Sequence, residues 1–104
     1  MFDDDLRPRL PAAAADYVAE VIRAHRCEVR LSRPRRTKLG DHRPPGRARP
    51  RHRITINEDL NPYAFLTTLL HEVAHAATWE RHRRRWLPPR PHGPEWQREF
   101  AVLL

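Results

Sequence analysis

The sequence predicts a single α+β domain over residues 1–104, with an N-terminal helix, a small antiparallel sheet and two further helices. Three observations lead to this fold class. Apolar residues recur at helical spacing near both ends and over residues 62–82, and they alternate singly in short segments between the first two helices. Turn signals separate these segments. A chain of this length forms one small domain with a thin core, burying only about 60 to 65% of the surface that the unfolded chain exposes.

The N-terminal third is predicted to form an arm, a helix and a strand. Residues 1–9 are polar and contain proline, which favours an irregular arm. Over residues 11–26 the apolar side chains fall on one face of a helix, opposite Asp16, Glu20 and Arg23. Residues 27–31 alternate between apolar and charged, which predicts a strand. Its first residue, Cys27, is expected to be a small buried hydrophobe.

Residues 33–53 are predicted to form a basic β-hairpin. Residues 37–40 are expected to be one strand, the Pro-Pro-Gly sequence at 44–46 marks a turn, and residues 51–57 alternate with Ile54 and Ile56 on one side. Nearly all the basic residues are arginine, which favours bidentate contact with phosphate or carboxylate. One hypothesis is therefore that the hairpin binds DNA; the alternative is a solvated loop whose charge discourages edge-to-edge aggregation. The residues of the DNA hypothesis are Arg35, Arg36, Lys38, Arg43, Arg47, Arg49 and Arg51.

The next helix is predicted over residues 62–82, with Asn61 as N-cap before a proline. It carries the pattern HExxH, in which His71 and His75 lie one turn apart on the same face. Two such imidazoles can share one Zn²⁺. Glu72 lies about 100° from His71 around the helix, so its carboxylate falls beside the metal, where it can take a proton from a bound water. These spacings indicate zinc-dependent hydrolysis.

A catalytic zinc needs a third protein ligand. The pattern HExxHxxGxxH is absent, because Thr78 and Arg81 stand at its last two fixed positions. His82 lies about 10 Å further along the helix than His75, which is too far for a bond of about 2 Å. The remaining candidates are His92 and Glu95.

The chain after the motif helix is predicted to form a stiff connector and a last helix. Prolines at 88, 89 and 91 exclude a helix, and Gly93 and Pro94 are suited to the N-cap and first position of a new one. Apolar residues then recur at helical spacing to Leu104, so either this helix packs inward or a C-terminal part is missing. Trp79 and Trp86 are expected to pack in the core or in a substrate subsite rather than to stack on bases.

The HExxH helix, the segment His92-Gly93-Pro94-Glu95-Trp96 and residues 54–57 together resemble the SprT-like zinc metallopeptidases, a family that includes the Spartan-type DNA–protein crosslink proteases. The resemblance implies a zincin-like minimal protease domain, with His71, His75 and His92 as zinc ligands and Glu72 as the base. It also implies that residues 51–57 form the edge on which an extended polypeptide substrate lies. Many members carry a cysteine-based zinc ribbon after the protease domain, whereas Cys27 is the only cysteine here.

The leading hypothesis is therefore a zinc endopeptidase that acts on polypeptides, with DNA-associated proteins as one substrate class. Tyr63 or a hairpin arginine is a candidate for stabilising the oxyanion. One alternative is a nucleic-acid-binding module with a structural or inactive zinc site, and another is a gluzincin-like peptidase that uses Glu95 as third ligand. No secretory signal or membrane span is visible, which predicts a cytoplasmic protein without a membrane partner.

Overall fold

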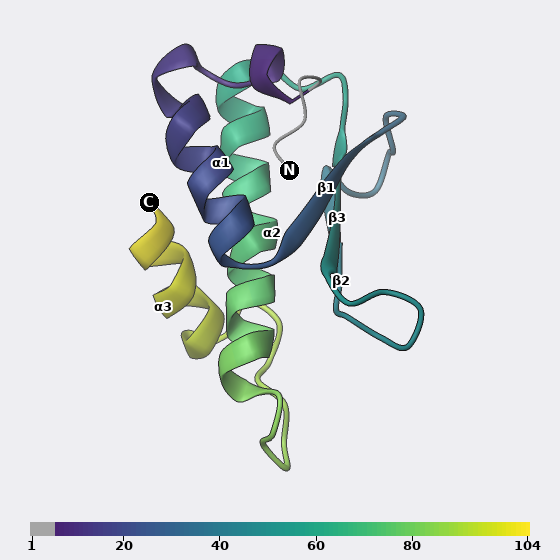
Figure 1. Ribbon diagram of the computed structural model, residues 1–104, viewed down its shortest axis with the longest axis vertical. Coiled ribbons are helices and arrows are strands. Elements are labelled where there is room, and N and C mark those ends of the chain that lie inside the picture. The colour runs from purple at the N-terminus through teal and green to yellow at the C-terminus, as the bar shows by residue number, and fades with distance from the viewer. Residues whose placement is uncertain (1–5) are drawn as a thin grey trace.

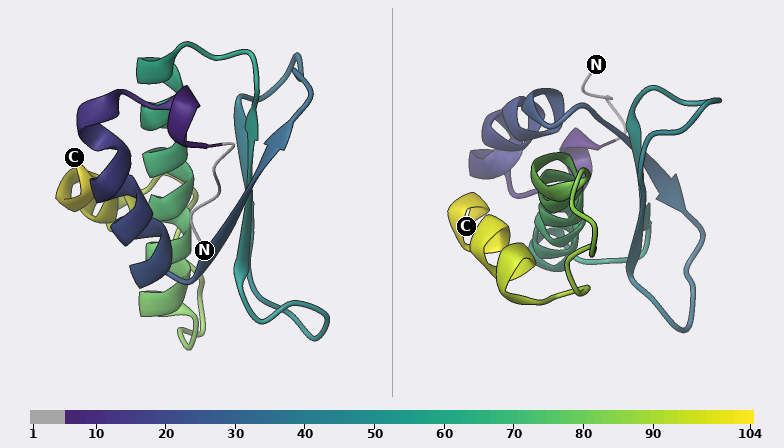
Figure 2. Two further views of the ribbon diagram at one scale, coloured as in Figure 1. Left: turned by 45° about the horizontal axis from the view of Figure 1, so that its top comes forward. Right: turned by 90° about the horizontal axis from the view of Figure 1, so that it is seen from below.

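The computed structural model describes residues 6–104, which form an α+β fold around helix α2 (Pro62–His82). Figure 1 shows the three-stranded sheet on one side of α2. The helices α1 (Ala15–Ala24) and α3 (Pro94–Leu103) lie on the other side, as the view from below in Figure 2 makes clear. Helix α2 is therefore enclosed between two layers. This is the reason why ten of its residues are buried although it lies in a small domain.

The chain before α1 is more ordered than a polar arm. Residues 1–5 lie outside the described residues, but Arg7–Arg9 and Ala12–Ala14 form short 3-10 helices. Leu6 and Leu10 are only 3% and 5% exposed and belong to the core. The predicted polar arm is therefore wrong for its described part, because these two leucines anchor the segment. The predicted helix over 11–26 is confirmed with a 3-10 start and slightly shorter ends.

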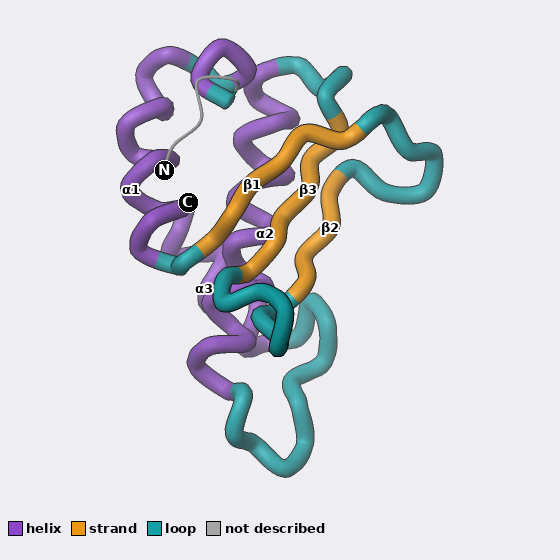
Figure 3. Tube along the Cα trace, turned by 45° about the vertical axis from the view of Figure 1, so that its right-hand side comes forward, coloured by secondary structure: helices purple, strands orange, loops and turns teal. Residues whose placement is uncertain are grey.

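The sheet contains β1 (Cys27–Ser32), β2 (Gly40–Arg43) and β3 (His52–Asn57) in the spatial order β1-β3-β2. Figure 3 shows β3 between the other two strands. The hairpin of β2 and β3 is antiparallel as predicted, whereas β1 pairs with β3 in parallel. The expected fully antiparallel sheet is thus a mixed sheet. The partner of β1 is 25 residues away in the register Cys27 to His52, so local turn signals do not reveal the pairing.

The loop between β1 and β2 passes over the end of β3 and is held there by side chains. Arg35 donates from Nε to Asn57 Oδ1 at 2.8 Å and from Nη1 to Thr55 Oγ1 at 2.9 Å. The buried Asn57 donates in turn to the carbonyl oxygens of Arg35 and Lys38. These bonds take the place of a strand ladder. The second strand consequently begins at Gly40 rather than occupying the predicted residues 37–40.

The predicted bounds of α2 are confirmed, and its start is capped. Asn61 Oδ1 accepts a hydrogen bond from the backbone N–H of Ala64 at 2.9 Å, and Pro62 opens the helix. The inward face of α2 packs against the β3 side chains Ile54 and Ile56, which have no exposed surface. Burial of this apolar area contributes most of the stability of such a small domain.

Helix α3 packs inward through Trp96 and Leu103, whereas Val102 and Leu104 are 79% and 76% exposed. The hydroxyl of Tyr17 on α1 donates to the carbonyl oxygen of Leu103 at 2.5 Å and joins the two outer helices. None of the described helices combines the length and the apolar character that a transmembrane span requires.

Candidate metal centre

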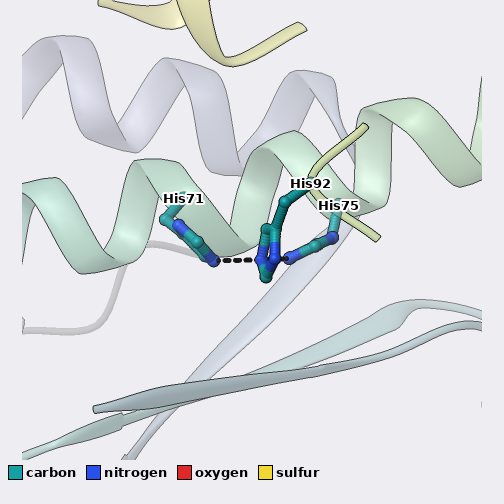
Figure 4. A group of neighbouring side chains, drawn as sticks. All are labelled: His71, His75 and His92. Carbon is teal, nitrogen blue, oxygen red and sulfur yellow. Dashed lines mark hydrogen bonds between the residues drawn. The ribbon is translucent and has the colours of Figure 1, made fainter. Parts of the chain in front are cut away.

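Three histidines from two separate segments meet at the surface of α2. His71 and His75 extend from adjacent turns of the helix, and His92 comes from the turn before α3. The distance from His92 Nε2 to His71 Nε2 is 3.0 Å, and that to His75 Nε2 is 3.1 Å. Figure 4 shows the His92 ring between the other two. The structure thus brings together the three residues that the family resemblance implied as ligands.

His92 is held in place by strong local constraints. Its φ of 60° lies in the left-handed region, which costs a non-glycine residue on the order of 1 to 2 kcal/mol. Gln97 Nε2 donates to the His92 carbonyl oxygen at 3.0 Å, and the Gly93 N–H donates to the Arg90 carbonyl at 3.0 Å. Trp96 packs edge-on against the His92 ring and donates from Nε1 to the carbonyl of His71. The strained turn is therefore fixed to the motif helix itself.

The chemistry of these nitrogens fits a divalent metal ion. Three imidazole nitrogens within 4.8 Å of one another cannot satisfy one another as hydrogen-bond partners, since each neutral ring has only one N–H. Burial and the neighbouring imidazoles lower the pKa of His71 and hold that of His75 at about 4. Both rings are thus neutral at pH 7, which is the form that binds zinc. The two separations from His92, 3.0 and 3.1 Å, are close to the spacing of about 3.4 Å that ligands at about 2.1 Å would have around a tetrahedral ion.

Glu72 lies beside the three histidines in the same cleft. Its side chain is largely buried, at 7% exposure. Burial is the main reason why its pKa rises to about 7; the charge of Asp41 adds to the rise, and the charges of Arg35 and Lys38 oppose it. A carboxylate with a pKa near 7 can both accept and return a proton at neutral pH. Its position and its pKa therefore suit a general base.

The cleft has a volume of about 540 Å³ and lies between α2 and the strand β2. Gly40 lets the two walls approach closely: a Cβ at this position would lie 3.0 Å from Glu72 Oε2 and 2.8 Å from Thr68 Cγ2. The wall opposite α2 is β2, which forms an edge of the sheet. Residues 51–57, which were expected to form this wall, do not line the cleft. Strand β3 is central, because β1 and β2 occupy both of its sides. Residues 51–57 are therefore not an edge of the sheet, and the edge strand that borders the cleft is Gly40–Arg43.

Other candidates from the sequence lie away from the metal centre. The carboxylate of Glu95 accepts a hydrogen bond from Arg85 Nη1 at 2.7 Å, and among the described residues only the three histidines form a close ligand group. This geometry gives no support to Glu95 as third ligand. Tyr63 is 73% exposed and does not line the cleft. None of the hairpin arginines lines it either, so the described cleft contains neither oxyanion candidate.

Several arginines of the DNA hypothesis have partners within the protein. Arg35 binds β3, and Asp41 pairs with both Lys38 and Arg43 at 3.2 and 3.5 Å. The side chains of Arg36, Arg47 and Arg51 are exposed. The expectation of core or subsite packing is wrong for Trp86, which is 95% exposed and does not line the cleft. Trp79 packs edge-on against His52.

Besides the three clustered histidines, the structure contains a pair of histidines that was not predicted from the sequence. His42 on β2 and His52 on β3 form a hydrogen bond of 2.8 Å between Nε2 and Nδ1, and the His42 ring stacks toward His75. His52 has no exposed surface. The available signal was the alternation in β3, which places His52 on the same face as Ile54 and Ile56. Glu80 on α2 approaches the other nitrogen of His52 at 3.4 Å.

Taken together, an α+β fold and three converging histidines beside a buried glutamate define a small candidate metal-binding domain. A family model for the SprT-like family matches residues 6–102, nearly the whole length, and the chain belongs to this family. Membership is consistent with a metallopeptidase, and the close histidines accord with the zinc association of the family. No match was found among curated proteins or among solved structures.

Proposed function

We propose that the protein is a zinc-dependent endopeptidase with a zincin-like site. The main support is the convergence of the Nε2 atoms of His71, His75 and His92 beside the buried carboxylate of Glu72. These three histidines would hold the zinc ion. A zinc ion in such a site supplies Lewis acidity toward a water molecule and a substrate carbonyl.

Glu72 is the proton carrier of the proposed reaction. With a pKa of about 7 it accepts a proton from the attacking water, and it later delivers that proton to the leaving amine. Gly40 keeps the opposite wall free of a side chain at this point, because a Cβ there would lie only 3.0 Å from the Glu72 carboxylate. Trp96 and Gln97 hold the His92 turn against α2, so the ligand set is organised before substrate arrives.

The proposed substrate is an extended polypeptide that lies along β2. This strand forms one edge of the sheet and lines the cleft, so its outer backbone groups can pair with a substrate strand. Structured substrate would have to unfold locally before it could adopt this geometry.

The second part of the proposal is that DNA-associated proteins are substrates. Support comes from the exposed Arg36, Arg47 and Arg51 and from the exposed Trp86, which adjoins a run of arginines. The same features favour the alternative function, a nucleic-acid-binding module. Affinity for single-stranded DNA should then fall with salt, with a logarithmic slope of about −0.7 for each phosphate contacted. A response independent of salt would remove this part of the proposal.

Glu72→Gln tests the endopeptidase proposal. Zinc-loaded protein should cleave an unfolded protein substrate, and the variant should lose this activity by at least about a hundredfold while retaining one zinc per chain. Glu58→Gln, an exposed position, is the matched control and should behave like the parent. Cleavage that survives in the Glu72 variant would contradict the assigned base. Zinc binding without any cleavage by the parent would favour the binding module.

A further inference from the structure

Lys38 is the only lysine of the chain and, among residues 6–104, the only lysine or arginine that lines the cleft. It lies on the β2 wall, just before the strand begins. Gly40 contacts Glu72 and Thr68, and His42 stacks toward His75, so β2 and α2 run in the same direction along the cleft. Lys38 is therefore near the end of the cleft closest to the start of α2, where Thr67 is also part of the lining.

The backbone of Lys38 is held in place by Asn57, and its ammonium group remains accessible. Its carbonyl oxygen accepts a hydrogen bond of 2.9 Å from the side chain of Asn57, which is 1% exposed. The next carbonyl, that of Leu39, accepts from the Asn57 N–H at 2.9 Å. The ammonium group lies 3.2 Å from Asp41 Oδ1, and its side chain remains 45% exposed. A fixed backbone with an accessible charge is suited to ligand recognition.

We propose that Lys38 determines substrate specificity by binding an acidic side chain of the polypeptide. This inference rests on the proposed function, since it assumes that a polypeptide occupies the cleft. An ammonium on a flexible stem can turn from Asp41 toward a carboxylate of the substrate, and it repels a basic side chain at the same place. Lys38 is two residues before Gly40, and Gly40 lies beside Glu72. Because side chains two positions apart on a strand share one face, the substrate residue that meets Lys38 lies about two positions from the cleaved bond.

The test uses peptides that are identical except for Glu, Gln or Lys at successive positions on either side of one cleavable bond. Binding is measured by fluorescence anisotropy to the zinc-loaded Glu72→Gln variant, which is expected to bind without cutting, and kcat/KM is measured with the parent. At one position Glu should be preferred over Lys by about tenfold in both assays. Lys38→Met should remove this preference, Lys38→Glu should reverse it, and Lys38→Arg should retain it. Arg33→Glu, an exposed charge reversal outside the cleft lining, should leave it unchanged.

The outcomes separate this inference from the proposed function. If the parent cleaves with a preference that no Lys38 variant changes, the inference is overturned and the endopeptidase proposal stands. An equal loss of kcat for all peptides in Lys38→Met also overturns it, since that result assigns the charge to the reacting carbonyl. Selective binding that depends on Lys38, without cleavage by the parent, supports the inference as peptide recognition while the hydrolase assignment fails. Thermal unfolding of each variant verifies that the fold is retained.

Discussion

Two groups of histidines differ in how their ring nitrogens meet. The candidate metal centre contains His71, His75 and His92, and the group called here the buried pair contains the part-buried His42 and the fully buried His52. In the first group three Nε2 atoms converge, with separations of 3.0 and 3.1 Å, and His92 is exposed. In the second group His42 Nε2 and His52 Nδ1 form one hydrogen bond of 2.8 Å, and His52 is completely buried. The first arrangement leaves lone pairs for an ion, whereas the second uses one N–H and one lone pair between two rings.

This difference shows that close imidazoles alone do not indicate a metal site. A single hydrogen bond satisfies the two ring nitrogens that face each other in the buried pair, and the outer nitrogen of His52 is left without a hydrogen-bond partner. Mutual hydrogen bonds between neutral rings with one N–H each cannot satisfy all three clustered Nε2 atoms, whereas a shared cation would accept a lone pair from every one of them. We therefore expect a metal-binding role for the first group and a structural role for the second.

The largest effect is expected for His92→Ala. The variant loses one ligand of three, so stoichiometric zinc and proteolysis should both be lost while the fold remains. Zinc should raise the unfolding temperature of the parent, because it binds only the folded state, and it should not raise that of the variant. Zinc content after gel filtration and calorimetric unfolding measure these outcomes. His82→Ala, on α2 but outside both groups, is the control, and unchanged zinc content in His92→Ala would contradict the assigned ligand set.

The reverse pattern is expected for His52→Ala. Removal of a fully buried ring leaves a cavity and an unpaired His42 nitrogen, which should lower the free energy of unfolding by about 3 kcal/mol. Zinc should still bind at one ion per chain. Chemical denaturation and metal analysis provide the two measurements. A loss of zinc at a temperature where the variant is folded would mean that the two groups form one functional unit.

The contrast also explains which features were predictable from the sequence. The spacing of His71, Glu72 and His75 fixes their positions on one helix, and Asn61 and Pro62 fix where that helix starts. The residues alone left His92 and Glu95 as candidates for the third ligand, and only the family resemblance selected His92, because it lies seventeen positions after His75 and its place depends on the fold of a loop. The roles of these residues stay predictions, although their convergence is observed.

The sheet was predicted less completely because its pairing is not local. The turn at residues 44–46 predicts the hairpin of β2 and β3, but no local signal indicates that β1 joins β3 on its other side. The wrong choice of the substrate edge follows from this omission. Trp86 was also misjudged, since composition favours a buried tryptophan and only the fold shows that the loop projects into solvent.

Acid sensitivity provides a smaller test of the buried pair. Burial, and then the charge of His52, lower the pKa of His42 from 6.5 to about 4. The unfolded state therefore binds more protons between these values, so stability is fully present above pH 6.5 and falls as the pH drops toward 4. For His42 alone we expect a loss on the order of 2 kcal/mol. Denaturation of metal-free protein at pH 7 and pH 4.5 should show a smaller loss in His42→Gln than in the parent; an equal loss would exclude His42 as a contributor.

The smallest effect is expected for Glu80→Gln, which tests whether the buried pair extends to a third member. Glu80 Oε1 lies 3.4 Å from His52 Nε2, but that nitrogen lacks a hydrogen bond of good geometry, and the Glu80 side chain is 34% exposed. A long contact with a solvated carboxylate contributes little, so the free energy of unfolding should fall by less than about 1 kcal/mol. Zinc content should not change. A loss as large as that of His52→Ala would instead show that the carboxylate holds the His52 tautomer and that the pair depends on it. Comparison of Glu80→Gln with His52→Ala in one denaturation series decides between these outcomes, because the first variant changes only the contact to the outer nitrogen of His52 and the second removes the whole ring.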